Sequence, residues 1–178
     1  INQMSLFLIL LAGGDGKRLR TKTAKPFNKV GNKSLLEYSL KTFENLQKIK
    51  KTIIVYNKKH KKYLNKIKFK KGVIKISGGR TRQESVFGAL KKIKEMNCDK
   101  VLIHDVARPN VSKSLVEKII SYLKKNDAVI PVIKANDAIK RVEKNTIFKN
   151  IQRNSLRFAQ TPQGFTFKKI YEKHKNNL

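Results

Sequence analysis

The chain is poor in cysteine and acid, and it has no long apolar run. Cys98 is the only cysteine, so no internal disulfide can form, and no zinc-finger pattern is present. No apolar run approaches the roughly 20 residues that a membrane-spanning helix requires. The N-terminal apolar run has no basic segment before it and is too short for a secretory signal. We therefore expect a cytoplasmic protein without a membrane segment.

The shortage of acid gives the chain a large positive charge. Lysine and arginine number 42 against 12 acidic residues, a formal net charge of +30. Such a balance is typical of nucleic-acid binding through phosphate contacts. The eight arginines, however, lie near glycine-rich or turn motifs, whereas lysines are spread along the chain with a dense patch at 58–71. Arginine suits bidentate phosphate binding, whereas lysine acts as a solvated point charge. We therefore interpret the arginines as functional residues and the lysines mainly as solvent-exposed surface residues. Nucleic-acid binding is a remote alternative, since no pattern of aromatic residues for base stacking is present.

The first candidate site is a glycine turn that follows an apolar run. Residues 6–11 are uninterrupted apolar residues, as in a buried parallel strand, and Gly13, Gly14 and Gly16 follow. Cations come next, beginning with Lys17 and Arg18. Glycines let backbone N–H groups approach an anion and cations neutralise it, so this stretch predicts a polyphosphate site. Its spacing matches neither the P-loop nor the dinucleotide fingerprint, and an ordinary strand–helix turn is the alternative.

Two further motifs follow apolar strands. Gly78-Gly79-Arg80-Thr81-Arg82 comes after the strand expected at 73–76, and His104-Asp105-Val106-Ala107-Arg108-Pro109 after the strand expected at 101–103. Loops at the carboxyl ends of neighbouring parallel strands converge on one crevice. A carboxylate at such a strand end suits a Mg²⁺ ion bridging triphosphate oxygens. The alternatives are a helix cap by Ser77 or Thr81 and an Asp105–Arg108 turn pair. His104 is interpreted as structural, and His60 and His174, which lie among lysines, give no site signal.

The periodicity predicts one α/β domain over residues 1–178. Strands at 52–56, 73–76, 101–103 and 128–132 alternate with helices at 33–45, 58–69 and 83–96, which indicates a mostly parallel sheet with helices on both faces. The first of these helices would be capped by Asn32 or Ser34. From residue 134 the pattern favours an extended hairpin-like arm with Glu143-Lys144-Asn145 in its turn.

These motifs together resemble one family. The sequence L-A-G-G-x-G-x-R with a lysine seven residues on, G-G-x-x-R-x-x-S-V, H-D-x-A-R-P, R-N and T-P-Q are all present. The chain resembles the 2-C-methyl-D-erythritol 4-phosphate cytidylyltransferases of isoprenoid-precursor biosynthesis. The resemblance implies a Rossmann-like nucleotidyltransferase, a three-layer sandwich with a protruding β-arm. It also implies transfer of CMP from CTP to methylerythritol phosphate with release of pyrophosphate.

The resemblance assigns roles to individual residues. Arg18 and Lys25 would be catalytic, and Asp105 would hold Mg²⁺ and contact substrate together with Arg108, Arg153 and Thr161. The CTP site would comprise Ala12, Gly13, Gly14, Gly16, Gly79, Arg82, Ser85 and Ala107. The arm at about 134–157 would reach across a homodimer, so that Arg153 acts in the neighbouring subunit's site.

The chain departs from the family pattern in three places. Lys25-Pro26 stands where the family reads P-K-Q, and Asp137-Ala138 stands where it has Asp-Thr. The resemblance covers only part of the family domain, so we expect the C-terminal part to be missing, as in the N-terminal piece of a longer or bifunctional enzyme. A related cytidylyltransferase acting on ribitol phosphate is the alternative enzyme, because its nucleotide half would look much the same.

Overall fold

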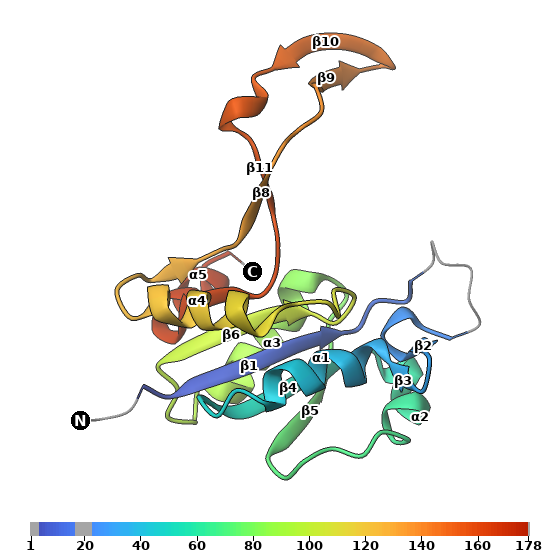
Figure 1. Ribbon diagram of the computed structural model, residues 1–178, viewed down its shortest axis with the longest axis vertical. Coiled ribbons are helices and arrows are strands. Elements are labelled where there is room, and N and C mark those ends of the chain that lie inside the picture. The colour runs from blue at the N-terminus through green and yellow to red at the C-terminus, as the bar shows by residue number, and fades with distance from the viewer. Residues whose placement is uncertain (1–3, 17–22, 178) are drawn as a thin grey trace.

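A six-stranded sheet forms the centre of the protein (Figure 1). The computed structural model describes residues 4–16 and 23–177. The strand order is β5-β4-β1-β6-β12-β7; the first four are parallel, and β12 is antiparallel to both its neighbours. The strands are β1 (Leu6–Ala12), β4 (Ile49–Tyr56), β5 (Val73–Ser77), β6 (Lys100–Asp105), β7 (Ala128–Val129) and β12 (Gln163–Thr166). The carboxyl ends of the parallel strands therefore meet at one edge of the sheet.

Helices cover both faces of this sheet. They are α1 (Leu35–Glu44), α2 (Lys61–Leu64), α3 (Arg82–Ile93), α4 (Lys113–Leu123) and α5 (Phe167–Lys175). Alternate side chains of β1 point to opposite faces, so Leu8 and Leu10 pack with buried residues of α1 and α4. Phe7 and Ile9 pack on the other face with α3 and with partly buried residues of α5. The predicted three-layer α/β fold is confirmed.

A side-chain cap defines where α1 begins. Ser34 accepts a hydrogen bond from the Glu37 backbone N–H, and the Glu37 carboxylate accepts one from the Ser34 backbone N–H (2.7 Å). This capping box selects Ser34 over Asn32 as the start of α1. Before it, η2 (Lys25–Phe27) and the short strands β2 (Lys29–Val30) and β3 (Lys33–Ser34) connect the first glycine turn to the helix.

Two of the sequence-based predictions are wrong in part. Instead of a helix over 58–69, the chain forms η3 (Lys58–His60) and the four-residue α2. A continuous helix would place Lys58, Lys62 and Lys66 four residues apart on one face, where like charges repel. The strand expected at 128–132 is split into β7 and β8 (Val132–Lys134). Pro131 lies between them and has no N–H group to donate to a strand ladder.

A two-stranded antiparallel hairpin projects away from the layers (Figure 1). Strands β9 (Ile139–Glu143) and β10 (Thr146–Ile151) form it, and Lys144 and Asn145 supply its turn with φ of 46° and 64°. Below it, β8 pairs with β11 (Arg157–Ala159), and η4 (Arg153–Ser155) lies between β10 and β11. The predicted turn is confirmed, and we call the segment 134–157 the arm.

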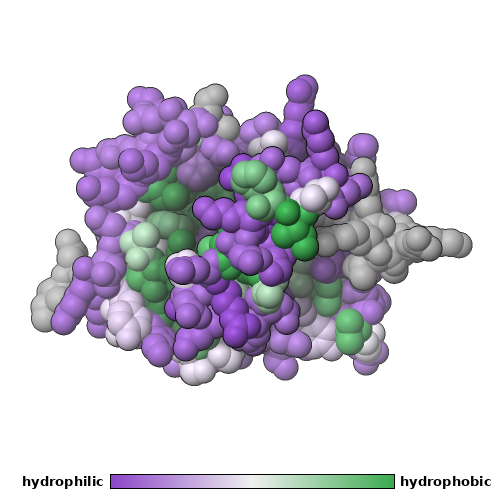
Figure 2. All heavy atoms as spheres, turned by 90° about the horizontal axis from the view of Figure 1, so that it is seen from above, coloured by the Kyte–Doolittle hydropathy of each residue, from purple (hydrophilic) through white to green (hydrophobic). Residues whose placement is uncertain are grey.

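The arm carries exposed apolar side chains. Val142, Ile147 and Phe148 are each more than half exposed. Seen from the arm side, the molecule is mostly hydrophilic with hydrophobic side chains among the polar ones (Figure 2). Within residues 4–16 and 23–177, no helix has the length and hydrophobicity needed to cross a bilayer.

Candidate nucleotide site

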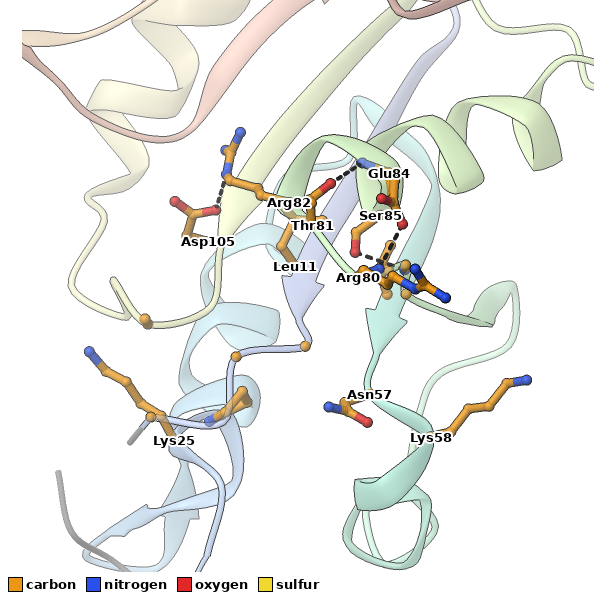
Figure 3. A pocket seen from close by; sticks show the side chains of 18 of the residues that line it. Leu11, Lys25, Asn57, Lys58, Arg80, Thr81, Arg82, Glu84, Ser85 and Asp105 are labelled. Atoms are coloured by element: carbon orange, nitrogen blue, oxygen red, sulfur yellow. Dashed lines mark hydrogen bonds and ion pairs between the residues drawn. The ribbon is translucent and has the colours of Figure 1, made fainter. Parts of the chain in front are cut away.

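A cavity of about 960 Å³ lies at the carboxyl edge of the parallel strands (Figure 3). Its walls come from the residues that follow β1, β4, β5 and β6. In Figure 3, Lys25 and Asp105 flank the end of β1 on one side, and Asn57, Lys58 and Arg80 lie on the other. The three predicted motifs therefore meet in one cavity, as their positions after neighbouring strands indicate.

The first glycine turn forms the floor of the cavity and brings Lys25 to it. Gly13, Gly14 and Gly16 all line the cavity. Gly16 has φ +65°, and a Cβ atom there would lie 2.6 Å from the Lys25 Cβ, so only glycine allows this approach. Gly16 and Lys25 therefore lie next to each other at the cavity. Arg18, the other predicted catalytic residue, lies outside the described residues.

The second glycine turn is held against the start of α3. The Ser85 hydroxyl accepts a hydrogen bond from the Gly79 N–H (3.1 Å), and the Glu84 carboxylate accepts one from the Arg80 N–H (2.8 Å). Thr81 caps the helix by accepting from the Glu84 N–H (3.0 Å). Gly79 is needed here because a Cβ atom would lie 2.5 Å from the Glu84 Cβ. The amino end of α3 therefore faces the cavity, where its partial positive charge favours an anion.

The end of β6 supplies the carboxylate of the site. Arg82 donates from Nε to Asp105 Oδ1 (3.1 Å), which links α3 to β6 across the cavity, and Ala107 and Arg108 complete this wall. The Arg108 guanidinium donates to the Gln160 side chain. The ion pair that forms is thus Asp105–Arg82, and the turn pair between Asp105 and Arg108 is limited to a backbone hydrogen bond.

Asp105 is the cavity carboxylate most suited to Mg²⁺. Within the described residues there is no group of three or more His, Cys, Asp or Glu side chains that could hold a metal ion. Mg²⁺ is commonly bound by one or two carboxylates together with substrate phosphates and water, rather than by a protein cage. The Asp105 side chain is 29% exposed and pairs with Arg82 through Oδ1 only, whereas the other lining carboxylate, Glu84, accepts from the Arg80 N–H. The donor set therefore fits an ion that enters with a nucleotide.

His104 joins the end of β6 to the chain before β12. It is fully buried, and its Nε2 lies 3.1 Å from the Arg108 carbonyl, which can only accept, so Nε2 carries the proton. Nδ1 then accepts from the Thr161 hydroxyl (3.0 Å), and that hydroxyl accepts from the Asp105 N–H (3.3 Å). Burial lowers the pKa of His104 from 6.5 to about 4, because the charged ring would lose its hydration. His104 is therefore a neutral structural residue, as expected from the sequence.

Three of the predicted site residues do not line this cavity. Ala12 is fully buried as the last residue of β1. Thr161 is 7% exposed, and its hydroxyl is engaged between His104 and Asp105. Arg153 lies on η4 in the arm, where it donates to the Asn136 carbonyl. Of the predicted residues, those at the cavity are Gly13, Gly14, Gly16, Lys25, Gly79, Arg82, Ser85, Asp105, Ala107 and Arg108.

The structure adds cavity residues to which the sequence analysis assigned no role in the site. Asn57 and Lys58 line the cavity directly after β4, and Arg80, Thr81 and Glu84 line it at the second turn. Asn57 and Lys58 follow a buried strand that is parallel to β1, so their position at the carboxyl edge was the available signal. Because Asn57 and Lys58 stand in a lysine-rich stretch, they could not be told apart from ordinary surface residues.

The layered fold, with its cavity of glycine turns and cations at the carboxyl edge, defines a nucleotidyltransferase of the Rossmann-like type. The sequence model of the IspD family, described as 2-C-methyl-D-erythritol 4-phosphate cytidylyltransferase, matches residues 6–178. The chain belongs to this family.

Named relatives agree with this assignment. The chain is 43% identical over 173 residues to the bifunctional enzyme IspD/IspF of Pelagibacter ubique, covering 97% of this chain and 46% of that protein. It is 38% identical to the 2-C-methyl-D-erythritol 4-phosphate cytidylyltransferase of Clostridium beijerinckii, covering 94% of this chain and 75% of that protein. Among solved structures, the 4-diphosphocytidyl-2C-methyl-D-erythritol synthase of Anaerococcus prevotii superposes with a TM-score of 0.84 at 28% identity, covering 99% of this chain and 77% of the other. The chain thus spans under half of the bifunctional relative and about three quarters of the other two.

Proposed function

We propose that this protein transfers CMP from CTP to 2-C-methyl-D-erythritol 4-phosphate, a step of isoprenoid-precursor biosynthesis. The observation that carries the proposal is the convergence of two glycine turns, Lys25 and the Asp105–Arg82 pair on one cavity. Family membership supplies the two substrates. Because the reaction consumes a nucleoside triphosphate, we also propose the cytoplasm as its location.

The reaction needs two anions to be brought together. A phosphate oxygen of the acceptor attacks the α-phosphorus of CTP; the bond from this phosphorus to the oxygen bridging to the β-phosphate breaks, and pyrophosphate leaves. Such transfers need in-line positioning and cations where negative charge develops more than covalent help from the protein. We assign the stabilisation of that charge to Lys25 and the binding of the phosphates to the backbone N–H groups of the glycine turns, because all of these line the cavity. By the resemblance, Arg18 shares the role of Lys25.

The remaining groups position the substrates. The second glycine turn and Ser85 are assigned to the base and ribose, because they lie across the cavity from Lys25. When Mg²⁺ is bound, Asp105 would hold it, and the ion would neutralise phosphate charge. We propose that Arg153 binds the acceptor phosphate of a neighbouring subunit, since it lies in the arm and outside the cavity of its own chain. This requires a homodimer formed through the arm.

The test is pyrophosphate release with CTP and Mg²⁺, measured in parallel with methylerythritol phosphate, with ribitol phosphate and without acceptor. Moderate salt suppresses nonspecific binding of polyanions to the basic surface. We expect release that depends on methylerythritol phosphate and is lost in Lys25→Ala. Turnover of ribitol phosphate alone would overturn the assignment of the acceptor. Release that is equal with and without acceptor would overturn the transferase assignment itself.

A further inference from the structure

An acidic residue lies within the phosphate-binding turn. Asp15 stands between Gly14 and Gly16, both of which line the cavity, yet Asp15 does not line it. A carboxylate that pointed into a triphosphate site would repel its ligand, because like charges at close range are unfavourable. Something therefore has to keep this side chain out of the cavity.

The segment after β4 holds the Asp15 carboxylate. Its Oδ1 atom lies 2.9 Å from His60 Nε2 and 3.1 Å from Asn57 Nδ2. Because a carboxylate oxygen accepts, His60 Nε2 carries a hydrogen in this contact whether the ring is neutral or charged. Asn57 is itself fixed at the start of η3, where its Oδ1 accepts from the Lys59 N–H (3.0 Å). Two donors from one rigid turn thus converge on one oxygen of Asp15.

His60 also contacts the other end of the same loop. Its ring centroid lies 6.3 Å from that of Phe27 and 6.3 Å from that of Tyr63, and these two rings stack on each other at 5.7 Å. Phe27 is 6% exposed and follows Lys25 in the chain by two residues. Because Gly16 and Lys25 lie next to each other, His60 links Asp15, which precedes Gly16, to Phe27, which lies two residues after Lys25. Its own side chain is only 18% exposed.

We propose that His60 is a positioning residue for the cytidylyltransferase reaction, one that turns the Asp15 carboxylate away from the CTP phosphates and fixes the Lys25 segment against the glycine turn. The proposal rests on the function proposed above. His60 and Asp15 both lie outside the cavity lining, and their roles follow from the contacts described above and from no sequence motif.

The test separates the charge of Asp15 from the packing of the ring. His60→Phe keeps an aromatic ring beside Phe27 and Tyr63 but removes the hydrogen bond to Asp15. His60→Gln keeps a donor and loses the ring. Asp15→Asn removes the charge, and it is combined with His60→Phe in a double variant. His174→Phe is the matched control, because His174 lies on α5 and stacks on Phe87.

Calorimetric binding of CTP with Mg²⁺, without acceptor, is the first readout, and thermal unfolding shows that each variant is folded. We expect His60→Phe to weaken CTP binding on the order of tenfold, and the added Asp15→Asn to restore it to within about threefold of wild type, because the repelling charge is gone. His60→Gln and His174→Phe should bind CTP like wild type. A purely structural role for His60 does not predict rescue by removal of a charge.

A second readout concerns the ring. With CTP saturating, kcat should fall in His60→Gln, in which the ring contact to Phe27 is lost, while the CTP affinity stays normal. Unchanged CTP binding in His60→Phe, or failure of Asp15→Asn to restore it, would overturn the proposal. Wild-type protein that binds CTP but transfers nothing to methylerythritol phosphate would refute the assigned acceptor and leave the binding test valid.

Discussion

Acidification should destabilise the folded protein through His104, whose ring is neutral in the folded state. Its pKa of about 4 in the folded protein lies below the ordinary value of 6.5 that it takes in the unfolded chain. The unfolded chain therefore binds the proton more readily, so this histidine contributes stability that is fully present above pH 6.5 and is lost as the pH falls towards 4. At about 1.4 kcal/mol for each unit between 6.5 and about 4, the full loss is about 3.5 kcal/mol, of which about 3 kcal/mol is lost by pH 4.

Other groups also titrate in this range, so a variant has to isolate the effect. The glutamine in His104→Gln retains a hydrogen-bond donor and an acceptor but is not protonated in this pH range. All other titrating groups of the variant are the same as in the wild type. The free energy of unfolding can be measured by urea titration at a series of pH values. As the pH is lowered, it should fall faster for the wild type than for His104→Gln. We expect the difference between the two proteins to change by about 3 kcal/mol between pH 7 and pH 4.

Proton NMR provides a direct check, because the chain has three histidines. Their ring signals can be assigned with single His→Gln variants. The His104 signal should stay constant from pH 8 to pH 5. A His104 signal that titrates near pH 6.5, or unfolding curves whose difference is independent of pH, would refute the buried neutral ring and its hydrogen bonds to Arg108 and Thr161.

Three further predictions concern the site, the arm and the core. Lys25→Ala should lower kcat by about 10²–10³-fold and leave the dissociation constant of CTP within about threefold, as single-turnover rates and calorimetry would show; equal weakening of CTP binding with normal turnover would contradict a transition-state role. If Arg153 acts in the neighbouring subunit, mixing inactive Lys25→Ala and Arg153→Ala chains should restore roughly a quarter of wild-type activity, since half of the dimers are mixed and each holds one intact site; no recovery after subunit exchange would place Arg153 in its own chain's site. Gly164→Ala should destabilise the fold by about 1–3 kcal/mol in urea titrations, because its Cβ would lie 2.5 Å from Leu123 Cδ1. Gly88→Ala is the control, for a Cβ there meets no atom within 4 Å, and stability equal to or above wild type is expected; similar losses in both would contradict the packing argument.

The central strands of the fold could be predicted because their residues carry a local signal. The apolar runs that became β1 and β6 are buried on both sides, and the glycine motifs that follow them mark the edge where the cavity lies. The arm's turn could be predicted from Lys144 and Asn145, since asparagine tolerates positive φ. By contrast, the helix expected at 58–69 failed because apolar spacing alone ignores repulsion between lysines.

Long-range contacts explain what the sequence could not show. His104 and Thr161 are 57 residues apart, and His60 and Asp15 are 45 apart; each pair is brought together by strand order. His60 gave no signal among its lysine neighbours, because its role depends on a carboxylate that lies on another loop. Thr161 was assigned to the substrate by resemblance, whereas its side chain is buried beneath the site. Geometry of this kind has no periodicity that a pattern could detect.

The arm has an evolutionary consequence. Its hairpin is closed by its own ladder of hydrogen bonds and packs no residue into either side of the sandwich, so most of its side chains face solvent. Substitutions there carry little folding cost, whereas a change at a buried position of β1 or β6 disturbs a filled interior. If the arm completes the neighbouring subunit's site, as proposed, selection can remodel partner choice and acceptor choice through the hairpin while the nucleotide half stays constant. Under that proposal the substrate can change without any change in the groups that bind the nucleotide.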